Sequence, residues 1–193
     1  MFSLGLLAVA IAIVSYGLYF RDIFAGRTKP HALTWLIWSI LNSVVFYQQL
    51  MAGAGPGAWV TGAAAVANLL IFVASFWYGE RRITRFDWVC LVLALAAVMV
   101  LLYDPYPVAS VTVVSAVFVI GMIPTLRKSL YNAHEETAVT FALNGIKFLI
   151  ALFALQVLSV TTVLYPLVLC ITNLLFAAFL FYQQAKYRRA SRE

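Results

Sequence analysis

The chain has 193 residues, of which 64% are hydrophobic and 10% are charged, and its formal net charge is +6. A soluble domain carries about 25% charged residues, so this composition excludes an ordinary soluble protein and predicts an integral membrane protein. The positive charge does not indicate a nucleic-acid partner, because the basic residues stand in short breaks between apolar runs. Cys90 and Cys170 both fall inside apolar runs, so we expect no disulfide framework.

A membrane-spanning helix needs about 20 mainly apolar residues. The first apolar run has no basic region before it and no small-residue cleavage site, so we expect a retained helix and not a signal peptide. The sequence therefore predicts an all-α integral membrane protein with seven transmembrane helices, which in chain order cover 2–20, 32–51, 57–79, 86–103, 107–124, 138–157 and 162–183.

The loops predict the orientation of the chain. The connections after the second, fourth and sixth segments hold no basic residue, and Asp104 is their only charge. By the positive-inside rule the N-terminus lies outside and the C-terminus is cytoplasmic, in a bacterial inner membrane or a plasma membrane. All 13 basic residues except Lys147 lie in the other three connections or the tail: Arg21, Arg27, Lys29, Arg81, Arg82, Arg85, Arg127, Lys128, Lys186, Arg188, Arg189 and Arg192.

An internal repeat is indicated by matches at a nearly constant offset. Asn68 opens an Asn-Leu-Leu triplet that recurs 105 residues later at Asn173. An offset of 106 pairs Arg21 with Arg127, Thr34 with Thr140, and Trp35 with Phe141. The predicted organisation is a three-helix repeat over 1–83, a linker helix over 84–105, a second three-helix repeat over 106–185 and a basic tail over 186–193. The linker helix gives the two repeats a parallel orientation, as in several transporters.

The stretch IPTLRKSLYNAHEET, which begins at Ile123, resembles the Pro-Thr, basic, Thr-Glu pattern that opens the second repeat of the SWEET and PQ-loop transporter superfamily. The resemblance covers nearly the whole chain in topology, although the proline-glutamine dipeptide is absent. It implies alternating access, with Asn68 and Asn173 at the places of the paired sugar-contacting asparagines. Of the four helix prolines of SWEET proteins, Pro124 alone can be placed, and Leu18, Trp38 and Phe141 stand near the other three. The expected hinge or gate residues are Pro124, Thr34, Thr140 and Phe141.

Four polar residues stand near the midpoints of four different segments, namely Asn42, Asn68, Lys147 and Asn173, and Asn144 shares a helix face with Lys147. Polar residues inside lipid-embedded helices usually face the bundle interior. We therefore predict a substrate site made of these five residues and Trp38, which lies one turn from Asn42. The alternatives are that the asparagines only hold helices together, at about 0.6 kcal/mol per contact, and that Trp38 only packs.

Lys147 is the sharpest anomaly, because a lysine at the bilayer centre costs about 2.5–3.5 kcal/mol on insertion scales. No Asp or Glu lies in the core of any predicted helix to neutralise it. It can lose its proton, bind carbonyl groups of a neighbouring helix, or pair with an anion such as a small carboxylate. Mitochondrial pyruvate carriers, in the same superfamily, are similar in using a basic pocket residue.

The sequence shows no enzyme constellation. His31 and His134 stand in loops without metal-ligand spacing, and no nucleophile–base pair or P-loop is present, so we expect no enzyme, cofactor or metal. The leading hypothesis is a carrier for a small polar solute, a sugar or a small organic anion, by facilitated diffusion or with Lys147 as proton carrier. A PQ-loop type receptor and a non-transporting scaffold are the alternatives, and a homo-oligomer stays open.

Overall fold

The computed structural model describes residues 1–103 and 107–190, so Asp104 and Arg192 lie outside the described residues. The described chain contains seven α-helices and two short 3-10 helices, and no strand. In chain order these are α1 (Phe2–Phe24), α2 (Ala32–Met51), η1 (Gly55–Ala58), α3 (Trp59–Tyr78), α4 (Arg85–Tyr103), α5 (Pro107–Asn132), η2 (Ala133–Glu135), α6 (Ala138–Ala154) and α7 (Val160–Ala190).

Each predicted segment forms a helix, but several predicted ends are wrong. The segments 107–124 and 162–183 are too short, because α5 continues through Pro124 and α7 runs from Val160 to Ala190. Apolar composition marks only the apolar part of a helix, whereas intrahelical hydrogen bonds carry it further into polar sequence. Helix α6 ends at Ala154, short of the predicted residue 157, where the chain turns to an extended backbone at Leu155.

Among the described residues, four helical stretches are long and apolar enough to cross a membrane: α1, η1 with α3, α5 with η2, and α7. Helix α6 is apolar but has only 17 residues. Large apolar side chains are exposed on the outside of the bundle, among them Ile13, Phe153 and Leu175. A soluble protein rarely exposes so much apolar surface, and lipid explains it. These findings support a membrane-integral protein, while the count of seven spans and the orientation stay predictions.

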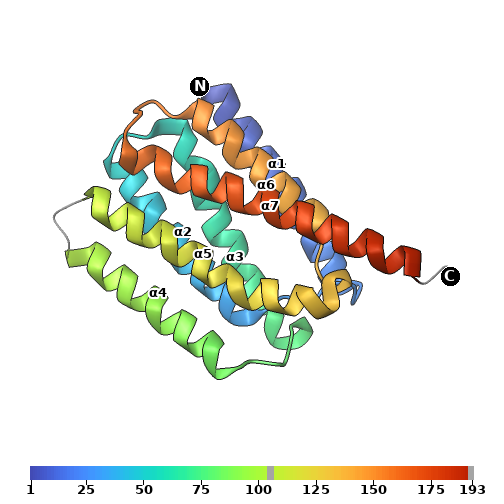
Figure 1. Ribbon diagram of the computed structural model, residues 1–193. Coiled ribbons are helices and arrows are strands. Elements are labelled where there is room, and N and C mark those ends of the chain that lie inside the picture. Colours follow the sequence, from blue (N-terminus) through green and yellow to red (C-terminus); the bar gives the residue numbers. More distant parts are fainter. Residues whose placement is uncertain (104–106, 191–193) are drawn as a thin grey trace.

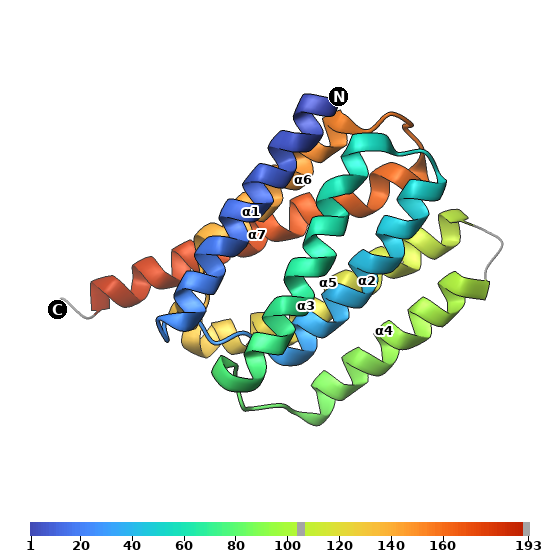
Figure 2. The same cartoon turned by 180° about the vertical axis from the view of Figure 1, so that it is seen from behind.

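The helices pack in the same way in two sets. Helix α3 packs against both α1 and α2, and α7 packs against both α5 and α6. The sets meet where α1 packs on α6 and α2 packs on α5, and α4 lies at the edge of the bundle against α5 and α2 (Figures 1 and 2). Gly145 allows α6 to approach α7 closely, since a Cβ there would lie 2.5 Å from Leu174 Cγ. The repeat over 1–83 and 106–185 stays a prediction that this packing favours.

The connections gather at the two ends of the bundle. Residues 25–31, 79–84 and 133–137 lie at one end, here called the basic end, where Pro30 O accepts a hydrogen bond from Glu80 N at 3.0 Å and Lys29 N donates to Glu135 O at 3.1 Å. At the other end the connections before α3 and before α7 meet, and Gln156 N donates to Ala54 O at 3.1 Å. The three basic connections thus share one end of the molecule.

Candidate functional site

A small central cavity lies between the two sets of helices. Trp38 and the four predicted asparagines line it together: Asn42 from α2, Asn68 from α3, Asn144 from α6 and Asn173 from α7. Its volume is about 10 Å³, which is close to the least that holds one water molecule. The structure therefore brings together five of the six predicted binding residues, although the space between them is too small for a solute.

The asparagine amides keep hydrogen-bonding capacity beside this cavity. Asn42 Nδ2 donates to Trp38 O at 2.7 Å, and Asn173 Nδ2 donates to Leu169 O at 2.8 Å, each inside its own helix. Asn42 Oδ1 and Asn68 Oδ1 are buried and have no hydrogen-bond partner among the described residues. Two carbonyl acceptors next to the cavity are thus free to accept from a hydroxyl or N–H group of a solute.

The fourth asparagine is bonded differently. Asn144 Oδ1 accepts a hydrogen bond from Ser15 Oγ at 3.0 Å and so connects α6 to α1. This contact is of the interhelical type that holds helices together, whereas Asn42 and Asn173 bond only their own helices. Asn144 therefore makes a structural contact between helices, whereas packing does not explain the unbonded Oδ1 atoms of Asn42 and Asn68.

Lys147 is fully buried but does not line the central cavity. Its Nζ atom lies 4.0 Å from the centroid of the Tyr16 ring and 5.2 Å from that of Phe148. Within the described residues it has no hydrogen-bond partner, so the alternative of a bond to carbonyl groups of a neighbouring helix is not formed. Tyr16 lines the cavity, so Lys147 Nζ contacts a ring of the cavity wall without lining the cavity itself.

Aromatic side chains that the sequence analysis did not select complete the cavity wall. They are Tyr16, Trp35, Phe118 and Phe148. Trp38 Nε1 donates to Phe118 O at 3.2 Å, and the two rings stack with centroids 5.1 Å apart. In this closed form Trp38 therefore packs on Phe118. Aromatic residues are frequent throughout the apolar segments, so composition alone carries no signal that separates these four from the others.

The predicted gate residue Phe141 belongs to an aromatic cluster. It is fully buried, with ring centroids 6.5 Å from Trp38, 6.4 Å from Tyr19 and 4.6 Å from Phe176. Tyr19 reaches from this cluster to Glu136 at the basic end, where its hydroxyl donates to Oε2 at 2.8 Å. The cluster thus lies between the central cavity and the basic end.

The two predicted threonines make different contacts. Thr140 Oγ1 donates to Ser15 O at 3.1 Å, and Ser15 Oγ approaches Thr140 O at 3.0 Å, which ties α6 to α1. Thr34 Oγ1 lies 3.4 Å from His31 Nδ1 at the start of its own helix. Thr34 therefore bonds next to its own helix, whereas Thr140 bonds a second helix, because the packing of α1 on α6 supplies its partner.

Two prolines stand inside helices. Pro124 is buried within the continuous helix α5. Pro166, in α7, was not identified from the sequence as a hinge candidate. A proline cannot donate to the carbonyl four residues earlier, and here that carbonyl, of Thr162, lies 3.5 Å from Gln49 Nε2 of α2. The signal for Pro166 was its position inside an apolar run.

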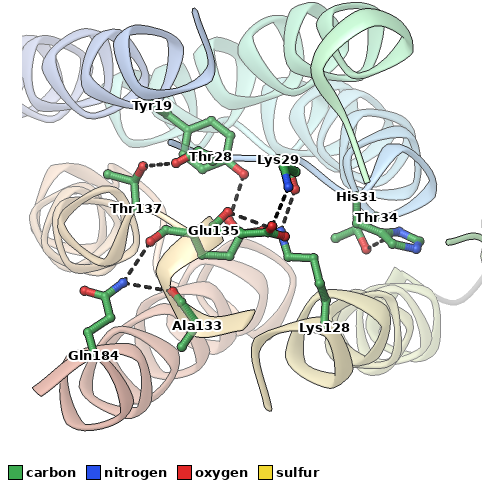
Figure 3. A network of polar contacts seen from close by, with 11 residues as sticks. Tyr19, Thr28, Lys29, His31, Thr34, Lys128, Ala133, Glu135, Thr137 and Gln184 are labelled. Atoms are coloured by element: carbon green, nitrogen blue, oxygen red, sulfur yellow. Dashed lines mark hydrogen bonds and ion pairs between the residues drawn. The ribbon is translucent and has the colours of Figure 1, made fainter. Parts of the chain in front are cut away.

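A network of polar side chains closes the basic end (Figure 3). Lys128 Nζ donates to Glu136 Oε1 at 2.5 Å and to Lys29 O at 2.5 Å, and Glu136 also accepts the Tyr19 hydroxyl. Burial raises the pKa of Glu136, while Lys128 and Tyr19 act in the opposite direction. The network joins α1, α5 and the connections that follow them, 25–31 and 133–137.

Further contacts link the connections 25–31 and 133–137. Thr28 Oγ1 and Thr137 Oγ1 share a hydrogen bond of 2.7 Å, and Gln184 Nε2 donates to the carbonyl oxygens of Ala133 and Glu136. Lys29 Nζ lies 2.5 Å from Glu135 Oε1, and this hydrogen-bonded carboxylate raises the pKa of Lys29. No sequence motif indicated the Thr28–Thr137 and Lys29–Glu135 pairs, because their members lie 109 and 106 residues apart.

Within the described part of the chain, no group of three or more His, Cys, Asp or Glu side chains could hold a metal ion. No family model, curated protein or solved structure gives a significant match to this chain.

Proposed function

We propose that the protein is a membrane carrier for a small polar solute, which binds in the central cavity between the two sets of helices. The observation that carries this proposal is the convergence of Asn42, Asn68, Asn144 and Asn173, from four helices, on one cavity. Buried polar groups in a membrane bundle are costly and mark functional positions. The topological resemblance to the SWEET and PQ-loop superfamily supports the same proposal.

The chemistry of the cavity favours a hydroxyl-bearing solute such as a sugar. The free acceptors Asn42 Oδ1 and Asn68 Oδ1 suit hydroxyl donors, and the surrounding aromatic rings suit the apolar faces of a sugar ring. A small organic anion is the second candidate, and Lys147 is the residue that favours it. Lys147 does not line the cavity, so an anion would reach its Nζ atom only after a rearrangement of the cavity wall.

Transport by this cavity requires the bundle to open. A volume of about 10 Å³ admits no sugar or carboxylic acid, so the described form is a closed one. Opening toward the basic end would separate α1 from α6, and with them Ser15 from Asn144 and Tyr19 from Glu136. Alternating access then consists of rearrangements of the two sets about the cavity.

Uptake by purified protein in liposomes tests the proposal. Labelled monosaccharides and small carboxylates are offered separately, and we expect saturable uptake of at least one of them. Asn173→Leu should abolish this uptake, whereas Thr172→Val, which alters the neighbouring residue bonded to Val168 O, should retain it. Ligand-dependent thermal stabilisation without uptake would contradict a carrier and favour a receptor. Equal uptake by both variants would contradict the site.

A further inference from the structure

The basic end contains a second and much larger cavity, of about 330 Å³. We call it the basic-end cavity. It is lined by His31 before α2, by Arg82 and Thr84 in the connection between α3 and α4, and by Arg127 and Lys128 near the end of α5. This volume lies within the size range of small-molecule sites. None of the residues predicted from the sequence to bind solute lines it.

Two cations of this cavity, Arg127 and Lys128, are held in place by hydrogen bonds to other residues. Arg127 donates to Asp87 Oδ2 at 2.9 Å and to Thr84 Oγ1 at 2.7 Å, and its side chain is still 33% exposed. Lys128 is fixed by Glu136 and by two carbonyl oxygens. Neither Asp87 nor Glu136 lines the cavity. A guanidinium fixed in this way keeps donors for a phosphate oxygen and loses little freedom on binding.

A third cation is free to turn toward a ligand. Arg82 is exposed, and its side chain has no partner among the described residues. The one acid that lines the cavity, Glu80, accepts a hydrogen bond from the backbone N–H of Arg82 at 2.8 Å. Tyr131 and Asn132 add a hydroxyl and an amide to the wall. The cavity therefore offers cationic and neutral donors together.

Exposed apolar side chains stand near these polar groups in the chain, and one of them lines the cavity. Ile83, at the cavity wall, is 42% exposed, and Leu126 and Leu130 on α5 are 37% and 50% exposed. Leu126 and Leu130 are four residues apart and so form one stripe of the helix. Helix α5 is one of the four that are long and apolar enough to cross a membrane, and the cavity lies at its end. At the end of this helix, the polar cavity suits the headgroup of a phospholipid and the apolar stripe suits an acyl chain.

We propose that the basic-end cavity binds the phosphate of an anionic phospholipid, with Arg82 and Arg127 on the phosphate and an acyl chain along Leu126 and Leu130. Basic pockets at the ends of membrane helices bind anionic headgroups through the same chemistry. A free phosphate compound shares the phosphate but lacks the acyl chain. This proposal does not depend on transport, because it needs neither the central cavity nor a solute.

Native mass spectrometry of the purified full-length protein in detergent tests the proposal. Phosphatidylglycerol and phosphatidylcholine are added separately, and we expect the first to bind more tightly. Arg82→Gln should weaken phosphatidylglycerol binding about five-fold, the effect of one arginine near an anionic headgroup. Arg81→Gln is the matched control, because Arg81 is the adjacent exposed arginine and does not line the cavity. It should leave the binding unchanged.

A second variant guards against loss of structure. Arg127→Lys keeps a cation beside Asp87 but removes the planar fork of donors, and it should also weaken phosphatidylglycerol binding. Equal weakening by Arg81→Gln and Arg82→Gln, or no preference for phosphatidylglycerol over phosphatidylcholine, would overturn the proposal. Thermal stabilisation by inorganic phosphate over chloride at equal ionic strength, without any lipid preference, would also overturn it and assign the cavity to a free phosphate compound.

Discussion

The central cavity and the basic end differ in whether their buried polar groups have hydrogen-bond partners. At the centre, Asn42 Oδ1, Asn68 Oδ1 and Lys147 Nζ have no hydrogen-bond partner among the described residues. At the basic end, Glu136 and Lys128 are also buried but are joined to each other and to further partners. A buried polar group without a partner costs about 1–3 kcal/mol. The basic end therefore supports the closed form, whereas the centre carries a cost that binding of a solute would relieve.

The largest expected effect comes from breaking the buried pair at the basic end. Lys128→Met leaves the Glu136 carboxylate buried without its cation and should lower the free energy of unfolding by about 3–5 kcal/mol. The thermal midpoint in detergent measures this change. Adding Glu136→Gln to Lys128→Met should recover part of the loss, because the uncompensated charge is removed.

The control for this change is Lys29→Met. The Lys29 side chain is 48% exposed in its pair with Glu135, and exposed pairs contribute little to stability. We expect a thermal midpoint close to that of the unaltered protein. A loss as large as that of Lys128→Met would mean that burial does not distinguish the two pairs.

A lysine-to-methionine substitution at the centre should change the free energy of unfolding in the opposite direction. Lys147→Met replaces a fully buried and unpartnered amine with an apolar side chain of similar length, and should raise the free energy of unfolding by about 1–3 kcal/mol. Thermal unfolding in the same detergent gives the comparison. Destabilisation equal to that of Lys128→Met would show that Lys147 has a partner in the membrane, and the contrast between the two regions would fail.

A smaller effect is expected where the centre does have a structural contact. Ser15→Ala removes the hydrogen bond to Asn144 Oδ1 and one of the two contacts with Thr140, and should cost about 1 kcal/mol. Ser43→Ala is the matched control, because Ser43 Oγ bonds only Ser39 O within its own helix. Equal thermal midpoints for the two variants would show that the α1–α6 contact contributes nothing to stability.

The smallest effect concerns pH at the basic end. Burial lowers the pKa of His31, although the nearby Asp87 opposes this change. In the unfolded chain a histidine takes up a proton near pH 6.5, so the folded state binds fewer protons there and stability should fall as the pH drops through this value. His31→Gln should reduce this slope in thermal unfolding between pH 5 and about pH 7. His134→Gln, at an exposed position in η2, is the comparison, and an identical slope in both variants would contradict the assignment.

The sequence predicted the depth of the central site better than its details. Asn42, Asn68 and Asn173 were selected because they stand at one depth in their segments, and Asn144 because it shares a helix face with Lys147. All four line one cavity. Lys147 stands at the same depth, yet it packs against the Tyr16 ring and does not line the cavity. Depth follows from counting residues along a helix at about 1.5 Å each, whereas the direction of a side chain depends on how neighbouring helices are rotated and packed.

The class of protein can be predicted from the sequence alone, and so can the seven helical segments and the gathering of basic connections. These properties are local: apolar length in lipid favours a helix because the backbone must bond to itself, and consecutive helices alternate in direction. Only the tertiary structure decided that Glu136 pairs with Lys128, that Ser15 bonds Asn144, and that Arg82 and Arg127 share a cavity. Such partners come from separate helices and loops, so they are chosen by packing, which no single segment specifies.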